Sequence, residues 1–258
     1  MRSASLTRQQ LQIINKRTLR YPLDNAERDY YLTVALSLIA DSPLAQMLVF
    51  KGGTALHHCY LPQHRFSEDI DFSCINSAGL SLALVKEVLE RDGLFEVRKE
   101  YVSRATIKIE RLWFPGVWGQ PGAIKVEIDH LQNVLLPPRE LPYANVWGLP
   151  ITLPVMDVRE MCAEKLRAAC QRARYRDFYD LYLLFELLAP DVEDLVGLLH
   201  RKEVRRPITV DGLLEHWQIA VREFQEGKDL VHFSRAIPNE DIGAFLETIQ
   251  FAPILPNP

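Results

Sequence analysis

Cysteine is scarce in this 258-residue sequence: there are four, and no two of them form a Cys-x-x-Cys pair. The spacing matches no recognisable zinc pattern, and scattered thiols are typical of a reducing compartment. We therefore expect buried thiols without a redox or metal role at Cys59, Cys74, Cys162 and Cys170.

Long hydrophobic runs are also missing. No stretch reaches the roughly 18 apolar residues that a membrane-spanning helix requires, and residues 1–20 contain no apolar segment of the secretory type. We expect a cytoplasmic protein without membrane contact.

Neither sign of charge is in large excess, because 30 Lys and Arg residues face 34 Asp and Glu residues, for a net charge of −4. This balance excludes a polycation that coats nucleic acid by charge alone, so any nucleic-acid contact must be local. Hydrophobic residues, in contrast, make up 48% of the chain. That content is enough for the core of one large domain or two modest ones.

Hydrophobic periodicity predicts both helices and strands, which indicates a mixed α/β fold of the α+β kind. Apolar residues at helical spacing predict a helix over 25–40, which Asp41-Ser42-Pro43 ends. Further helices are expected over 55–60 and 81–91, and strands over 48–50, 69–73, 95–103, 105–112 and 124–129.

Proline marks the expected domain boundary. The segment 137–154 contains Pro137, Pro138, Pro142, Pro150 and Pro154, which interrupt regular structure. We predict a core domain over 1–150 and a helical C-terminal domain over 151–258. Its first helices are expected over 157–171 and 176–188, and Asp157 with Glu160 has the spacing of a capping box.

Two aspartates one residue apart are the most informative feature of the chain. Asp69 and Asp71 alternate with Ile70 and Phe72, so on a strand both carboxylates point to one side while the apolar residues face the core. Asp-x-Asp alone is common in solvated turns. Here the two aspartates lie on a strand that enters the core, and this makes a solvated turn a poor explanation, because a buried carboxylate is costly unless a cation meets it.

A third carboxylate would complete a metal site. Glu127 and Asp129 lie on the polar face of their strand and either can supply it; we prefer Glu127, which is nearer the middle. The alternative is an exposed strand face on which Lys125 and Lys108 pair with these carboxylates. Mg²⁺ suits such a site, with Mn²⁺ as a substitute, because it takes hard oxygen ligands together with substrate phosphates.

A glycine turn precedes the two aspartates. Gly52 and Gly53 lie between the apolar run 48–50 and a helix expected to begin near Thr54, where free N–H groups favour a phosphate. The turn Lys51-Gly52-Gly53-Thr54 is therefore a candidate nucleotide-binding segment. Metal and phosphate together indicate phosphoryl or nucleotidyl transfer, in which metal ions activate a hydroxyl and stabilise the leaving pyrophosphate.

Positive charge returns after the proline-rich segment. Lys165 shares a helix face with Met161, Ala168 and Ala169, which places its ammonium inward, toward a triphosphate. Asp177 and Asp180 follow at helical spacing and can pair with the nearby cations. We interpret a later basic cluster as surface, with contact to an RNA backbone as the alternative: Arg201, Lys202, Arg205 and Arg206.

Three histidines near the glycine turn, His57, His58 and His64, match no zinc spacing, and we assign them no metal role.

Two motifs resemble one known family. Phe50-Lys51-Gly52-Gly53-Thr54-Ala55-Leu56, followed by Arg65-Phe66-Ser67-Glu68-Asp69-Ile70-Asp71-Phe72, resembles the first motif of the AbiEii/AbiGii nucleotidyltransferase toxins. Glu164-Lys165-Leu166-Arg167-Ala168 through Arg176-Asp177-Phe178-Tyr179-Asp180-Leu181 resembles their C-terminal motif, and the two occur in the right order. The resemblance covers about residues 48 to 185. It implies the core fold of the DNA polymerase beta-like nucleotidyltransferases, a mixed sheet flanked by helices, followed here by a helical domain.

The resemblance also implies roles for single residues. Gly53 and Thr54 would hold the triphosphate, Ser67 would support the metal loop, and Asp69 and Asp71 would bind magnesium. Lys165 matches a family lysine near the nucleotide, and Asp177 and Asp180 match the Arg-Asp-x-x-Asp ending.

The implied activity is transfer of a nucleoside monophosphate from an NTP to RNA, at the acceptor end of tRNA. The implied setting is the toxin of a bacterial toxin–antitoxin or phage-defence pair, whose antitoxin is a winged-helix repressor. Two alternatives remain open: transfer to a protein hydroxyl, and a nucleotide-binding interaction module without catalysis.

Overall fold

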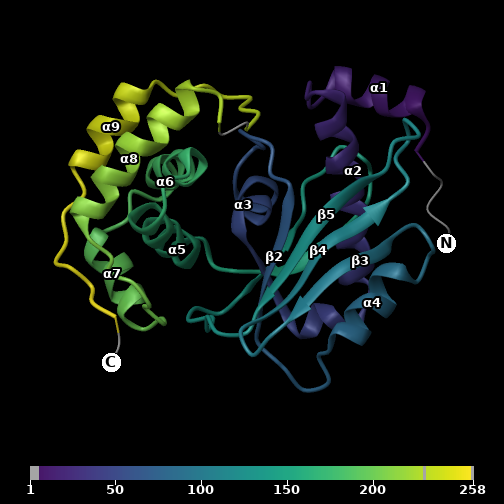
Figure 1. The fold of residues 1–258 in the computed structure, drawn as a ribbon, viewed down its shortest axis with the longest axis horizontal. Coiled ribbons are helices and arrows are strands. Elements are labelled where there is room, and N and C mark those ends of the chain that lie inside the picture. Colours follow the sequence, from purple (N-terminus) through teal and green to yellow (C-terminus); the bar gives the residue numbers. More distant parts are fainter. Residues whose placement is uncertain (1–5, 229–230, 257–258) are drawn as a thin grey trace. The chain divides into compact units, whose positions relative to one another are not determined.

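The computed structural model describes residues 6–228 and 231–256. The chain divides into two compact units (Figure 1). The sheet unit comprises Met1–Val134 and Pro138–Met156, and the helical unit comprises Leu135–Pro137 and Asp157–Pro258. Sheet and helices together confirm the predicted mixed α+β class.

A seven-stranded mixed sheet organises the sheet unit, in the order β3-β4-β5-β2-β1-β7-β6. Its strands are β1 (Leu48–Lys51), β2 (Asp69–Cys74), β3 (Glu96–Val102), β4 (Thr106–Phe114), β5 (Gly122–Asp129), β6 (Arg139–Pro142) and β7 (Thr152–Val155). β2 pairs antiparallel with β1 and parallel with β5, so the predicted Asp69–Asp71 strand is central in the sheet.

One face of this sheet carries the core. Ile70 and Phe72 of β2, Val126 and Ile128 of β5 and Ile109 of β4 are buried. Each such side chain contributes about 1.5–3 kcal/mol by leaving water. The helices α2 (Leu23–Ala40) and α4 (Leu82–Glu90) pack against the sheet (Figure 1). The alternate residues, including both aspartates, point to the other face.

The remaining helices of the sheet unit are α1 (Arg8–Arg17), η1 (Pro43–Gln46), α3 (Gly52–Ala55) and η2 (Leu56–Tyr60). The helix expected to begin near Thr54 instead begins at Gly52, with Lys51 as its N-cap. From Leu56 it continues as a π-helical turn. The two glycines therefore form the first turn of the helix rather than a linker before it.

The proline-rich segment is more regular than predicted. β6 and β7 lie within it and pair antiparallel with each other, and Val155 of β7 pairs with Phe50 of β1. The expectation that 137–154 lacks regular structure is therefore wrong. Pro142 ends the edge strand β6, a position where a missing N–H is tolerated.

The helical unit contains α5 (Val158–Gln171), α6 (Tyr175–Leu188), α7 (Val192–His200), α8 (Val210–Gln225) and α9 (Asn239–Glu247). α5 and α6 confirm the predicted helices over 157–171 and 176–188. Within the described ranges, 6–228 and 231–256, no helix is long and apolar enough to span a membrane.

The start of α5 differs from the expected capping box. Asp157 caps the helix by accepting a hydrogen bond from the Arg159 N–H at 3.0 Å. Glu160 does not reach back to the cap. Its buried carboxylate accepts hydrogen bonds from the N–H groups of Leu135 and Leu136, at 2.9–3.0 Å. The Glu160 carboxylate therefore accepts hydrogen bonds from the segment around Leu135 and Leu136, and not from the backbone at the start of α5 as the capping-box spacing had predicted.

Lys202 corrects a second expectation. Its side chain is fully buried, and its Nζ lies 2.6 Å from Glu160 Oε1 and 2.8 Å from Glu164 Oε1. The assignment of Lys202 to a basic surface cluster is therefore wrong, because two glutamates of α5 draw its ammonium inward.

The cysteines divide into two pairs. Cys162 and Cys170 are buried, as predicted, and burial raises the pKa of each thiol to about 12. Cys59 and Cys74 are only half-buried, so the expectation of full burial is wrong for these two.

Candidate active site

Asp69 and Asp71 project from the same face of β2, next to the parallel strand β5. In the register of the sheet, Asp71 is paired with Glu127 and Asp69 with Lys125. Directly paired residues point to the same face, so the two aspartates, the glutamate and the lysine form one group. This group, Asp69, Asp71, Lys125 and Glu127, is called the carboxylate cluster below.

The charges of the cluster act on one another. The pKa of Asp71 is raised to about 6, first because the group is buried and then because Asp69 and Glu127 add negative charge. Burial opposes the charge on Lys125, but Glu127 and the two aspartates outweigh it and raise the pKa of the ammonium. The carboxyl group of Asp71 thus resists ionisation, and a positive charge beside the three carboxylates is favoured.

Asp129 differs from Glu127 in its partners. The Asp129 carboxylate lies 3.2 Å from Lys51 Nζ and accepts hydrogen bonds from the N–H groups of Leu131 and Gln132. Although burial opposes ionisation, these contacts together lower its pKa. Asp129 is thus held by the chain itself, whereas Glu127 stands opposite Asp71.

In the observed side-chain arrangement, Glu127 Oε2 lies 2.7 Å from Lys125 Nζ. Among the residues that the structure describes, no three His, Cys, Asp or Glu side chains are arranged to hold a metal ion together. The donor set nevertheless suits a divalent cation, because it consists of hard carboxylate oxygens that repel one another. A cation there would take the place of the Lys125 ammonium beside Glu127.

The glycine turn lies against these carboxylates. Gly52 has a φ of +78°, and a Cβ at this position would lie 2.4 Å from Asp71 Oδ2. A Cβ at Gly53 would lie 2.5 Å from Arg65 Nη2 and 2.7 Å from Ser67 Oγ. Only glycine therefore fits at either position without displacing a neighbour, and the positive φ belongs to Gly52 alone.

Thr54 and Lys51 connect the turn to neighbouring strands. The Thr54 hydroxyl donates a hydrogen bond to the backbone carbonyl of Asp69, which fixes the start of β2 against α3. Lys51 pairs with Asp71 in the register and bridges to Asp129. The turn is thus built into the sheet on the side of β2 away from β5.

Arg65 is a site residue to which the sequence argument assigned no role. Its side chain is only 2% exposed, its Nη1 donates to the Phe66 carbonyl at 3.0 Å, and its guanidinium lies next to Gly53. A buried arginine beside a glycine turn is a candidate phosphate contact. The available signal was an arginine two residues before Ser67, inside the motif that contains the two aspartates.

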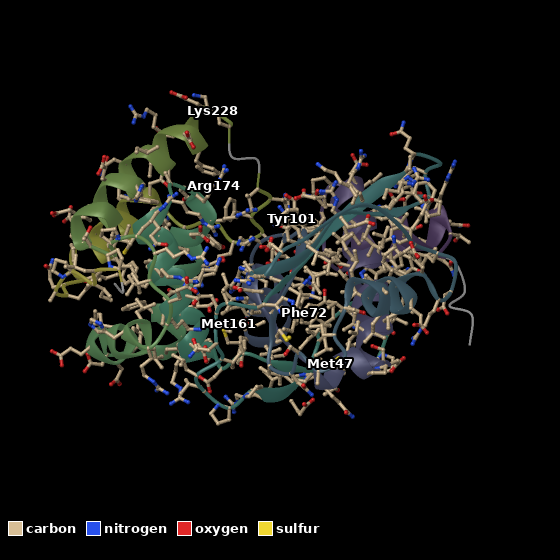
Figure 2. All side chains as sticks on the ribbon, turned by 60° about the horizontal axis from the view of Figure 1, so that its bottom comes forward. Met47, Phe72, Tyr101, Met161, Arg174 and Lys228 are labelled. Carbon is tan, nitrogen blue, oxygen red and sulfur yellow. The ribbon has the colours of Figure 1, made fainter. Side chains whose placement is uncertain are left out.

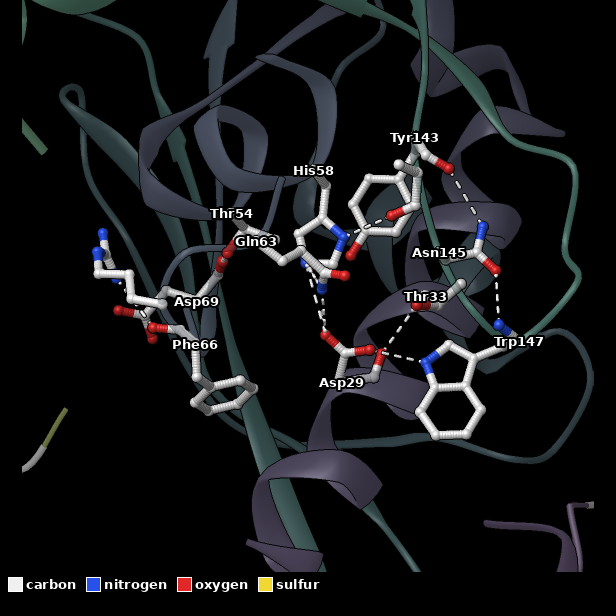
Figure 3. Close-up of polar contacts among 12 residues, drawn as sticks. Asp29, Thr33, Thr54, His58, Gln63, Phe66, Asp69, Tyr143, Asn145 and Trp147 are labelled. Carbon is white, nitrogen blue, oxygen red and sulfur yellow. Dashed lines mark hydrogen bonds and ion pairs between the residues drawn. The ribbon is translucent and has the colours of Figure 1, made fainter. Parts of the chain in front are cut away.

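A buried polar network supports this region from the α2 side (Figure 3). Asp29 of α2 accepts hydrogen bonds from Trp147 Nε1 at 2.7 Å and Gln63 Nε2 at 3.3 Å, and lies 3.5 Å from His58 Nε2. The His58 ring stacks on Tyr143 with a centroid distance of 4.2 Å. His58 thus joins α2, η2 and the β6–β7 loop, which is a structural role.

The helical unit contains a second charged group, called the lysine–aspartate cluster. Lys165 Nζ lies 3.0 Å from Asp177 Oδ1 and 2.8 Å from Asp180 Oδ2, and Arg172 Nε lies 2.7 Å from Asp177 Oδ2. Both aspartates are buried. Burial alone would raise the pKa of Asp177, but Lys165 and Arg172 outweigh it and lower the pKa to about 2. The structure thus brings Lys165 of one predicted helix together with Asp177 and Asp180 of the next.

Comparison with known proteins identifies the class of the molecule. Residues 34–255 match the family described as "Nucleotidyl transferase AbiEii toxin, Type IV TA system". The chain belongs to this family. Among solved structures it is similar to MenT4, a nucleotidyltransferase toxin from Mycobacterium tuberculosis H37Rv, with a TM-score of 0.67 and 24% identity. That match covers 93% of this chain and 90% of the other, and it shows a shared fold. No curated protein matches the sequence.

Family membership confirms the resemblance inferred from the two motifs. This AbiEii-family chain is an NTP-dependent nucleotidyltransferase and the toxin of a type IV toxin–antitoxin system. A type IV system implies an antitoxin partner, and the enzyme class implies an NTP substrate.

Proposed function

We propose that this AbiEii-family enzyme transfers a nucleoside monophosphate from an NTP to the 3′ end of an RNA, with tRNA as the acceptor. The attacking hydroxyl oxygen forms a bond to the α-phosphorus, and the bond to the leaving pyrophosphate breaks. The observation that supports this chemistry best is the carboxylate cluster, in which Asp71 has a pKa raised to about 6 beside Asp69 and Glu127.

Asp69, Asp71 and Glu127 are the proposed ligands for Mg²⁺, with Mn²⁺ as a substitute. When bound, the metal lowers the pKa of the attacking hydroxyl and neutralises charge on the phosphates. The carboxylate nearest the hydroxyl accepts its proton. Such a carboxylate must be ionised at neutral pH, and a cation bound beside Asp71 would favour its ionised form.

The residues around the glycine turn are the proposed binding site for the triphosphate. Because Gly53 has no Cβ, the Arg65 guanidinium and the Ser67 hydroxyl lie close against the turn that Gly52 and Gly53 form, and both groups can donate to phosphate oxygens. Lys51 and Thr54 fix the turn on the sheet. This arrangement supports an anion site next to the proposed metal ligands.

The lysine–aspartate cluster is the proposed second contribution to catalysis. Asp177 and Asp180 hold Lys165 in one orientation, so that its point charge is preorganised for nucleotide binding. The proposed antitoxin is a winged-helix protein encoded nearby.

The test incubates the full-length protein with each labelled NTP, in the presence or absence of Mg²⁺, and with either total RNA or a protein extract. Label in RNA that depends on Mg²⁺ supports the proposal. Label in protein would show a protein acceptor instead.

Two variants separate the candidates for the third carboxylate. Glu127→Gln should abolish transfer. Asp129→Asn should retain most of it, because Asp129 is engaged by Lys51 and two backbone N–H groups. Loss of transfer in Asp129→Asn, with activity retained in Glu127→Gln, would make Asp129 the third metal ligand in place of Glu127.

A further inference from the structure

One register position crosses five strands of the sheet. It places Lys51 of β1, Asp71 of β2, Glu127 of β5, Lys108 of β4 and Tyr101 of β3 in one row. Directly paired residues point to the same face, so Tyr101 shares the face of the carboxylate cluster. It stands three strand spacings, about 14 Å, from Asp71.

Tyr101 is unusually exposed for an aromatic residue in a strand. Its side chain is 58% exposed, and Figure 2 labels it on the edge strand β3. Trp113 lies on the same face, but the guanidinium of Arg98 covers it at 4.1 Å from the ring centroid. Tyr101 therefore presents a π-face that contributes little to the core.

The charge around Tyr101 is locally positive. On β3, Glu96 pairs with Arg98 at 2.8 Å and Glu100 pairs with Lys86 at 3.2 Å. Lys99 and Arg111 stand opposite each other on β3 and β4, and both are exposed. Within residues 6–228 and 231–256, neither of these two cations forms an ion pair.

Lys108 is the directly paired neighbour of Tyr101 and forms an ion pair with Glu110 on its own strand. The carboxylates of β3 and β4 are therefore each matched by a cation. Lys99 and Arg111 remain as positive charge available to an anionic partner.

We propose that Lys99, Tyr101, Lys108 and Arg111, called the β3–β4 strip, bind the single-stranded end of the RNA acceptor. Tyr101 stacks on a base upstream of the reacting terminus, and Lys99 and Arg111 contact backbone phosphates. Aromatic side chains for stacking and cations along the backbone are the two elements by which proteins bind single strands. This inference rests on the proposed function.

The strand order explains why the strip suits the acceptor rather than the NTP. The glycine turn follows β1, on one side of β2, whereas β5, β4 and β3 extend on the other side. A triphosphate at the turn and an RNA end on the strip would approach the carboxylate cluster from opposite sides. In-line displacement at phosphorus requires this relation between leaving group and nucleophile.

The first test measures RNA binding by fluorescence anisotropy, with the full-length protein and an end-labelled single-stranded RNA of the tRNA acceptor sequence. Tyr101→Ala should weaken binding by roughly 5- to 150-fold, the range for loss of one base–aromatic stack. Tyr101→Phe should bind like the unmodified protein. Val102→Ala is the matched control, because Val102 is 53% exposed on the same strand and points to the opposite face.

The second test varies the salt concentration. Lys99→Glu and Arg111→Glu should each flatten the slope of log K against log salt concentration by about 0.7, the value for one phosphate contact on a single strand. Lys16→Glu on α1 is the control for an exposed lysine elsewhere and should leave the slope unchanged.

Calorimetry with an NTP separates the two substrates. NTP affinity that is unchanged in Tyr101→Ala, together with lost RNA affinity, supports the strip. Equal loss of NTP affinity, or unchanged RNA affinity, in Tyr101→Ala would overturn it.

The inference and the proposed function fail in different ways. If the unmodified protein labels no RNA, the proposed function is wrong whatever Tyr101 does. If it labels RNA and Tyr101→Ala labels RNA equally well at subsaturating concentrations, only the β3–β4 strip is wrong.

Discussion

The two charged clusters of this enzyme shift the pKa of an aspartate in opposite directions. Asp71, in the carboxylate cluster, is half-buried beside two other carboxylates, and its pKa is raised to about 6. Asp177, in the lysine–aspartate cluster, is fully buried, but Lys165 and Arg172 lower its pKa to about 2. Loss of water opposes ionisation of both carboxylates, and the neighbouring charges decide the sign of the pKa shift.

The difference separates a cluster in which three carboxylates share one lysine from a cluster in which two aspartates meet a lysine and an arginine. A group of repelling carboxylates weakens the fold unless a ligand compensates it, and such groups occur at functional sites. A matched buried pair, in contrast, is costly to break, because the remaining partner stays buried and charged. Four predictions test this contrast, from the largest expected effect to the smallest.

Asp69→Asn or Asp71→Asn should lower nucleotidyl transfer by about 1,000-fold or more, because each removes a proposed metal ligand. Stability should stay equal or rise, because the change removes repulsion within the carboxylate cluster. Transfer kinetics and thermal unfolding of the purified variants measure the two effects. Activity near that of the unmodified protein in either variant would remove that aspartate from the catalytic role.

Lys165→Ala should raise the activation free energy by about 2–4 kcal/mol, the scale for loss of a preorganised charge. The variant should also lose stability, because Asp177 and Asp180 remain buried. Arg174→Ala is the control, because Arg174 is exposed at the start of α6, the helix that carries Asp177 and Asp180. Steady-state kinetics on both variants decide the matter: equally small effects would leave Lys165 a purely structural residue.

Gly52→Ala should lower transfer by about 100-fold, because its Cβ would meet Asp71 Oδ2 at 2.4 Å and move that carboxylate. The positive φ adds strain to the turn. Gly148→Ala has a similar positive φ and no neighbour within 4 Å of a Cβ, so it controls for backbone strain alone. If both variants lose the same activity, contact with Asp71 is not the cause.

Asp177→Asn should lower the free energy of unfolding at about pH 7 by about 2 kcal/mol. The folded pKa, about 2, is below the ordinary value of 3.8, so ionised Asp177 stabilises the fold above about pH 4. This contribution is lost as the pH falls toward 2. Urea unfolding of both proteins at about pH 7 and about pH 3 should show a smaller acid effect in the variant. An identical acid effect would mean that other groups carry the pH dependence.

Local patterns determined much of this protein. Alternation of Asp69 and Asp71 with Ile70 and Phe72 predicted a strand with carboxylates on one face, because side chains alternate along any strand. Helical spacing predicted α2, α5 and α6 for a similar reason. The two glycines also marked the turn, because a close approach of backbone to neighbouring groups tolerates no Cβ.

Contacts between distant segments decided what the sequence left open. The register of β2 with β5 placed Glu127 opposite Asp71. Contacts with Lys51 and with two backbone N–H groups engaged Asp129, which distinguished it from Glu127. Pairing with β1 formed a strand from a segment that proline content had predicted to be irregular. Lys202 was drawn inward by glutamates about 40 residues away. The sequence thus determined which side chains share a face, because that depends on local backbone geometry. Tertiary structure decided which charges meet, because Coulomb energy depends on distance in space rather than along the chain.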